Sequence, residues 1–265
     1  MTSPVREYRT IIDDSGNPGY INRILIGIPS TGSKRDEWVQ ARYGQLIPMN
    51  WAQVEMMQWM NSFMPLRYQV ADAQNLIIKT AIEKDFEFLL LYEHDVLPPP
   101  NAFVTLNRYM REEKVPIVSG LYYSRSRPSE PLVFRGRGNG VFTGWEMGDI
   151  VYCDGVPTGF LLIHMAVIRA LWDDSKEYEI RPGIVTRQVF YTPRDLWHDP
   201  ESGWYNSTSG TSDLDWCTRI IEGDYLRKAG WGEYVDGLHD PRYPFIVDTR
   251  DLFCRHINPN GEQFP

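Results

Sequence analysis

Short apolar runs alternate with segments of helical periodicity through the first half of the chain. The clearest run is 86–92, where three leucines stand between aromatic residues, as in a strand buried on both faces of a sheet. The preceding segment, 68–84, has its apolar residues at helical spacing, at Val70, Ala73, Leu76, Ile77 and Ala81. Alternating strands and helices of this kind predict an α/β fold with a mostly parallel sheet.

The same periodicities extend the prediction along the chain. Further strands are expected at 23–29, 115–122, 156–164 and 243–249, and further helices at 36–46, after Asn101, at 165–172 and at 211–230. Segment 54–64 fits a strand or a helix equally. The glycine-rich stretch 124–154 predicts one or two hairpins at the sheet edge. Segment 177–210 predicts a long loop, of the kind that often serves as a lid or binding loop.

Composition narrows the setting of the protein. The 265 residues carry a formal net charge of −8, which argues against a nucleic-acid-binding surface. The three cysteines are far apart and lack CxxC spacing, so neither a disulfide framework nor a cysteine zinc site is expected. The polar N-terminus and the absence of an apolar run near ~20 residues predict a cytoplasmic protein without a transmembrane segment, with peripheral attachment to a membrane left open.

Residues that could bind a metal or a proton follow the end of the predicted strand 86–92. Glu93, His94 and Asp95 follow it directly, and three prolines then prevent both strand and helix. Open α/β sheets bind their ligands at the carboxyl ends of their strands, so the triplet is a candidate site. The alternative is a solvated turn. The polar loop 30–33 after the first strand is likewise either a plain turn or a place where backbone approaches a ligand.

Two further groups stand at the ends of predicted elements. Asp213 lies in the first turn of the predicted helix 211–230, and His256 follows the last predicted strand. Mg²⁺ and Mn²⁺ prefer carboxylate oxygens, and Mn²⁺ also accepts imidazole. Asp95 with His256 around a nucleotide diphosphate fits such a site, where the metal offsets charge on the leaving diphosphate. Alternatively, Asp213 only interacts favourably with the helix dipole, and His256 is an ordinary surface residue.

The order of four stretches, 68–103, 117–128, 156–171 and 210–231, resembles the GT-A glycosyltransferases, most closely the inverting family that uses nucleotide-sugar donors. The resemblance implies a GT-A (Rossmann-like) fold, with a mixed, mostly parallel central sheet flanked by helices and a hairpin- and loop-rich acceptor side. It also implies a single catalytic domain over 1–265. Within it, 22–123 would form the nucleotide-sugar-binding half and 124–265 the acceptor-binding half.

The resemblance also assigns roles to individual residues. Asp95 matches the last acid of the DxD-type motif and would bind the metal; Glu93 matches its first acid, facing the metal or the ribose of the donor. His94 is the middle residue, Asp213 matches the catalytic base, and His256 completes the metal site. The sequence departs from the family at Glu93, at Ser212, where Glu is usual, and at Gln74-Asn75, where Arg-Asn is common.

The remaining site predictions extend the donor and acceptor surfaces. The predicted donor site consists of Pro29, Ser30, Thr31, Asn75, Glu93, His94 and Asp95. The predicted metal ligands are Asp95, His256 and Glu93, with Mn²⁺ or Mg²⁺ as the ion. The predicted acceptor site consists of Thr158, Gly159, Trp204 and Tyr205.

These assignments imply a metal-dependent glycosyltransferase. It would move a sugar from a UDP- or GDP-sugar to a hydroxyl of a glycan or other acceptor, by inverting displacement with Asp213 as base. A nucleotidyltransferase of similar fold and a non-catalytic sugar- or nucleotide-binding module are the alternatives. A helical metal phosphohydrolase with a His-Asp pair is disfavoured, because its ligands lie on helices, whereas His94-Asp95 ends a strand.

Overall fold

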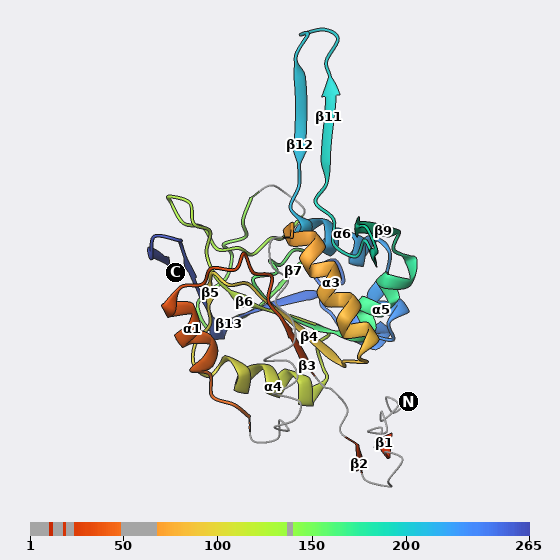
Figure 1. Ribbon diagram of the computed structural model, residues 1–265. Helices are drawn as coiled ribbons and strands as arrows, with labels where there is room; N and C mark the ends of the chain where they lie inside the picture. Colours follow the sequence, from red (N-terminus) through yellow and green to blue (C-terminus); the bar gives the residue numbers. More distant parts are fainter. Residues whose placement is uncertain (1–10, 13–17, 20–23, 49–67, 137–139) are drawn as a thin grey trace.

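A six-stranded mixed sheet forms the centre of the computed structural model, which describes residues 11–12, 18–19, 24–48, 68–136 and 140–265 (Figure 1). In spatial order its strands are β3 (Ile24–Gly27), β4 (Phe88–Tyr92), β8 (Phe160–His164), β6 (Ile117–Leu121), β13 (Phe245–Phe253) and β7 (Ile150–Cys153). Every residue of β3, β4, β8 and β6 is buried, as continuous apolar runs predict.

The strand directions correct the prediction of a mostly parallel sheet. Two pairings, β3–β4 and β6–β13, are parallel, whereas β4–β8, β8–β6 and β13–β7 are antiparallel. Strand β8 lies between β4 and β6 and runs against both, so these two strands point the same way. A fully buried apolar run has the same composition in either direction, which is why the sequence does not reveal this reversal.

Helices cover both faces of the sheet (Figure 1). The helices α3 (Val70–Glu83) and α5 (Met165–Asp174) pack against each other and against the sheet, and α4 (Ala102–Glu112) lies on the opposite side. A Cβ atom on Gly27 would stand 2.3 Å from Cγ2 of Ile77, so glycine at this position lets α3 approach β3 closely. The helices predicted at 68–84, 165–172 and after Asn101 are confirmed.

The remaining helices are α1 (Asp36–Tyr43), α6 (Ser212–Glu222), α7 (Tyr225–Lys228) and α8 (Gly232–Asp236). The helix predicted at 36–46 is therefore confirmed. The helix predicted at 211–230 is divided into α6 and α7. Asp224 separates them with a φ of 54°, in the left-handed region, and a right-handed helix does not continue through that conformation.

A small three-stranded sheet joins the end of the chain to the region after β4. Its strands are β5 (Val96–Leu97), β14 (Arg255–Ile257) and β15 (Gln263–Phe264), with β14 in the middle. His256 pairs with Val96 in the antiparallel register. This pairing brings a residue from the C-terminal end of the chain beside Asp95.

Two hairpins replace the long loop predicted over 177–210. The first consists of β9 (Glu177–Arg181) and β10 (Ile184–Arg187), and the second of β11 (Arg194–His198) and β12 (Tyr205–Ser209). The second hairpin projects far from the body of the protein (Figure 1). The strands of the second hairpin lack the polar–apolar alternation that marks a half-buried strand, whereas β9 has it over only five residues, with Tyr178 and Ile180 partly buried.

The remaining segments are short. Within 124–154, β7 joins the edge of the main sheet, and single bridges link Phe134 to Val141 and to Gly155, so the predicted edge hairpins are present only in part. β1 (Ile11–Ile12) and β2 (Pro18–Gly19) pair antiparallel. Segment 54–64 lies outside the described residues. Among the helices that the structure describes, none combines the length and apolar character needed to cross a membrane.

Candidate functional site

The acidic triplet leaves the sheet at the end of β4, and three other segments fix its backbone. The amide of Glu93 donates to the carbonyl of Gly159 at 2.8 Å, and the indole of the buried Trp38 donates to the carbonyl of Glu93 at 2.9 Å. The amide of Ile257 donates to the carbonyl of Asp95 at 2.8 Å. The triplet is therefore held by the segment before β8, by α1 and by β14.

His94 connects the triplet to the loop after β3. Its Nδ1 lies 3.2 Å from the carbonyl oxygen of Pro29, which can only accept, so Nδ1 carries the proton. Its Nε2 lies 3.3 Å from Oγ1 of Thr31 and accepts from that hydroxyl. Within the same loop, the amide of Gly32 donates to Oγ of Ser30 at 3.2 Å. The structure thus brings the predicted donor residues Pro29, Ser30 and Thr31 beside the triplet.

A chain of hydrogen bonds links Glu93 to the start of α6. Oγ1 of Thr158 donates to Oε1 of Glu93 at 3.4 Å, and Nε2 of Gln74 donates to Oγ1 of Thr158 at 2.9 Å. Oγ of Ser212 stands 3.5 Å from Oε1 of Gln74 and donates to it. Gln74 is fully buried on α3, so this polar path runs through the interior from the triplet to the residue before Asp213.

Burial and mutual repulsion dominate the electrostatics of the acids. Burial, followed by the negative charges of Asp95 and Asp213, raises the pKa of Glu93 to about 8, against the bond from Thr158. Glu93 is therefore mainly protonated at neutral pH. Burial also raises the pKa of Asp213, although the Thr211 hydroxyl and the Leu214 amide, which donates at 2.9 Å, stabilise its charged form.

Tyr122 lies among these acids. Burial and the charges of Glu93, Asp213 and Asp95 raise the pKa of its hydroxyl. That hydroxyl accepts from the amide of Gly159 at 2.6 Å. Glu93, Asp95, Asp213 and Tyr122 are thus close enough to act on one another, although they come from three different parts of the chain.

Asp95 and His256 are the two groups best suited to a metal ion. Oδ2 of Asp95 accepts from Nη1 of Arg125 at 2.8 Å, while Oδ1 is buried without a hydrogen-bond partner among the described residues. Nδ1 of His256 donates to the carbonyl of Tyr123 at 2.6 Å, which leaves Nε2 as the ligand atom. Burial lowers the pKa of His256 against the charge of Asp95, favouring the neutral imidazole that metals bind.

The predicted three-residue metal site is not assembled. Among the residues that the structure describes, no three His, Cys, Asp or Glu side chains are close enough to hold one ion. Glu93 therefore does not stand with Asp95 and His256 as a ready three-residue ligand set. Asp95 and His256 alone supply an oxygen and a nitrogen, a donor pair that suits Mn²⁺ when substrate oxygens and water provide the rest.

A cavity of about 830 Å³ opens beside the triplet, a size in the range of small-molecule sites. Its walls include Thr31, Lys34, Arg35, His94, Asp95, Arg125 and residues 257–259. Arg35 is already bound to Glu37 and to the carbonyl of Pro259. Lys34 and Arg125, which come from segments before and after Asp95 in the chain, add further positive charge to the wall. Asp36 and Glu37 also line the cavity, so basic and acidic side chains are mixed on its wall, and the basic ones could contact an anionic ligand.

Asn75 is not part of this cavity. It is fully buried, and its amide nitrogen donates to Tyr178 at 3.0 Å and to the carbonyl of Phe190 at 2.9 Å. Its Oδ1 accepts from the amide of Phe190 at 2.7 Å. The prediction of a donor contact at Asn75 is wrong, because its hydrogen-bonding groups anchor the segment around Phe190 to α3.

The predicted acceptor residues are not brought together either. Thr158 is buried in the hydrogen-bonded path to Glu93, and Gly159 is covered by Tyr122, whose oxygen would lie 2.3 Å from an added Cβ. Trp204 and Tyr205 are each 73% exposed at the end of the β11–β12 hairpin, which projects away from the body (Figure 1). Gly159 therefore serves packing rather than acceptor binding, and the two aromatic residues form a separate surface.

Sequence reasoning missed three residues of the site, namely Gln74, Tyr122 and Arg125. Gln74 and Asn75 carried a usable signal, since both are amides among the apolar positions of an otherwise core-facing helix. Buried polar groups need hydrogen-bond partners, so such a pair predicts an internal network. Tyr122 and Arg125 follow an apolar strand and carried no comparable signal.

Comparison with solved structures finds distant structural similarity only. No protein-family model matches the chain, and no curated protein matches it. Among solved structures, A197 from STIV is similar at 15% sequence identity and a TM-score of 0.48, over 91% of this chain and 93% of that chain. A likeness at this level assigns neither a fold family nor a function.

Replacing Glu93 with Gln tests the charge state of the cluster. An acid with a folded-state pKa of about 8 and an ordinary value of 4.5 contributes stability below about pH 4.5, and this contribution is lost as the pH rises through about 8. Gln does not ionise. The free energy of unfolding of Glu93→Gln, relative to the parent, should therefore rise by a few kcal/mol across this window in urea denaturation.

The matched control for this experiment is Glu83→Gln, at an exposed acid on α3 that forms an ion pair with Lys79. Its stability relative to the parent should change little over the same pH window. A flat difference for Glu93→Gln as well would mean that Glu93 ionises normally in the folded protein, contrary to the buried arrangement.

Proposed function

We propose that the protein is a metal-dependent glycosyltransferase of the GT-A type, which transfers a sugar from a nucleoside diphosphate sugar to an acceptor hydroxyl with inversion. The observation that carries the proposal is the position of Asp95. One of its oxygens is buried and unpartnered among the described residues, and it stands at the wall of a nucleotide-sized cavity with positive side chains. At such a position a carboxylate and the phosphates of a substrate can bind the same divalent cation.

The donor would occupy the cavity with its diphosphate near Arg125 and Lys34. The loop 29–31, tied to the triplet through His94, would contact the nucleoside. Asp95 and His256 would hold Mn²⁺ or Mg²⁺, which supplies charge neutralisation on the departing diphosphate when bound. Arg125 already neutralises Asp95 and can move to a phosphate oxygen once a cation takes its place, because guanidinium binds carboxylate and phosphate alike.

The acceptor would lie on the Asp213 side of the cluster. Asp213 would take the proton of the attacking hydroxyl, and burial makes its carboxylate a stronger base than an exposed aspartate. Glu93, which interacts with both Asp213 and Asp95, lowers the negative charge of the cluster when it is protonated. The mixed sheet is compatible with the GT-A arrangement, since β3, β4 and β6 share one direction and end near the proposed donor site.

Titration with nucleoside diphosphates and nucleotide-sugars, with and without Mn²⁺, tests the donor site. We expect one nucleotide to bind in a Mn²⁺-dependent manner, and Asp95→Asn to weaken that binding at least about tenfold, because it removes a charged ligand but little volume. Asp85→Asn, at an exposed ion pair with Arg169, is the control and should bind normally. If no nucleotide binds under either condition, the donor site and the proposed function both fail.

Arg125→Gln tests the exchange of Arg125 between Asp95 and a phosphate. Without the competing guanidinium, Mn²⁺ alone should bind several-fold more tightly, while nucleoside diphosphate binding should weaken. Both are measured by calorimetry. Arg127→Gln, which removes an exposed partner of Glu262 nearby, should change neither. Weaker Mn²⁺ binding in Arg125→Gln would show that Arg125 supports the metal site instead of competing with it.

Asp213→Asn tests the base. Sugar transfer should fall by roughly 10²–10⁴, with donor binding unchanged, since the amide cannot accept the proton at neutral pH. Asp215→Asn, in the same first turn of α6, is the matched control and should retain activity within a few-fold. Equal losses in both variants would indicate a structural effect on α6 and would remove Asp213 from its catalytic role.

A further inference from the structure

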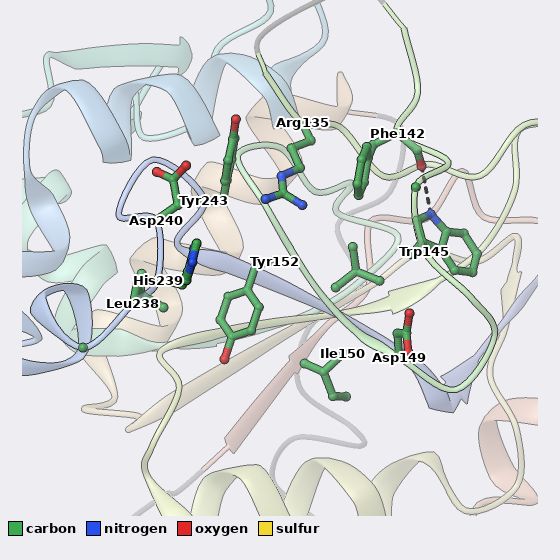
Figure 2. A pocket seen from close by; sticks show the side chains of 13 residues that line it. Arg135, Phe142, Trp145, Asp149, Ile150, Tyr152, Leu238, His239, Asp240 and Tyr243 are labelled. Atoms are coloured by element: carbon green, nitrogen blue, oxygen red, sulfur yellow. Dashed lines mark hydrogen bonds between the residues drawn. The ribbon is translucent and has the colours of Figure 1, made fainter.

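A second cavity, of about 410 Å³, lies along the edge strand β7 and shares no lining residue with the donor cavity. Its floor is formed by residues 150–152 of β7, and its walls by the loop 142–149 and the segment 237–243 (Figure 2). Aromatic, cationic and acidic side chains all face it. Nothing in the proposed transfer reaction uses this cavity, so its chemistry requires a separate explanation.

Arg135 is the most distinctive residue of the cavity. Its guanidinium carbon lies 4.1 Å from the ring centre of Tyr243 and 4.9 Å from that of Phe142, so the two rings hold it in place by cation–π contacts. Its nitrogens point into the space bounded by Tyr243, Tyr152 and Phe142 (Figure 2). Among the described residues, no carboxylate or carbonyl accepts a hydrogen bond from Arg135. A fixed guanidinium thus presents its donors to the cavity.

A second arginine nearby shows the contrast. The guanidinium of Arg242 donates to both carboxylate oxygens of Asp240, from Nη2 to Oδ2 at 2.6 Å and from Nε to Oδ1 at 2.9 Å. This pairing, with the charge of Arg135 as a smaller contribution, lowers the pKa of Asp240 to about 2. Asp240, an acid that lines this cavity, is therefore already neutralised by Arg242. The positive charge of Arg135 remains for a ligand.

The shape and charge of the cavity select the ligand. The planar fork of a guanidinium matches the two oxygens of a carboxylate. A phosphate group would bring a third oxygen and more negative charge toward Asp149 and Asp240, which line the same cavity. Tyr152 is 42% exposed and offers a flat ring for stacking. Asp149 and His239 offer acceptors for hydroxyl groups, although Asp149 already accepts one bond from the amide of Glu146.

We propose that this cavity binds a sugar acid, a hydroxylated ring that carries a carboxylate. The carboxylate lies on the guanidinium of Arg135, the ring stacks on Tyr152, and hydroxyl groups donate to Asp149 and His239. The cavity volume lies within the range of small-ligand sites. The proposal depends on no step of glycosyl transfer and stands on the side chains of this cavity alone.

Calorimetry of the full chain with three probes tests the ligand class. Glucuronate has both the carboxylate and the hydroxyls, glucose lacks the carboxylate, and cyclohexanecarboxylate lacks the hydroxyls. We expect glucuronate to bind at least about tenfold more tightly than either of the others, because only it uses both sides of the cavity. Equal binding of glucose, or no binding of glucuronate, would overturn the proposal. Tighter binding of glucose 6-phosphate would overturn the choice of carboxylate over phosphate.

Variants then locate the site. Arg135→Gln should lower the affinity for glucuronate at least about tenfold. Arg135→Lys keeps the charge and the ring contacts but not the planar fork, so its affinity should lie between those of the parent and Arg135→Gln. Tyr152→Ser removes the ring on the floor of the cavity and leaves Arg135 between Tyr243 and Phe142. This variant should weaken glucuronate binding even if Arg135→Gln disturbs folding. Asp95→Asn should bind glucuronate normally; loss of binding there would place glucuronate in the donor cavity and refute the second site.

Discussion

The close contact among Gly159, Tyr122 and Glu93 determines the geometry on which the candidate site depends. Gly159 donates its amide to the Tyr122 hydroxyl and accepts from the amide of Glu93, so one residue joins the ends of β6 and β4. An added Cβ would stand 2.3 Å from the tyrosine oxygen. Only glycine permits this approach, and without it the acids that follow β4 would not face the start of α6.

The antiparallel insertion of β8 has a related effect. Because β8 runs against both β4 and β6, those strands share a direction with β3, and their carboxyl ends meet at one edge. Thr31, Asp95 and Arg125 are thereby gathered from segments far apart in the sequence. The resulting concentration of acids in a buried place is costly, and the protein reduces the cost by protonating Glu93 and by pairing Asp95 with Arg125.

Much of the fold was predictable because buried strands and amphipathic helices leave strong periodic signals. The strand ending at Glu93 and the helix carrying Gln74 are examples. Strand direction and the β11–β12 hairpin were not predictable, because neither leaves such a signal. The β9–β10 hairpin and the break at Asp224 left weaker signals, namely the short alternation in Glu177–Arg181 and the glycine at position 223. In the candidate site, Asp95, His256 and Asp213 could be singled out because each is an acid or a histidine at the end of a predicted strand or helix. Asn75 and Gly159 were misassigned because a buried structural role and a ligand contact select the same residue types.

The projecting β11–β12 hairpin behaves as a removable module of the chain. The amide of Gly210 donates to the carbonyl of Pro193 at 3.0 Å, so the two ends of the hairpin are already adjacent at its base. Among residues 194–195 and 197–206, whose side chains the structure describes, none belongs to the hydrophobic core. A two-residue turn is enough to close such a gap. The position is therefore suited to deletion or to the grafting of a foreign loop, with the central sheet left intact.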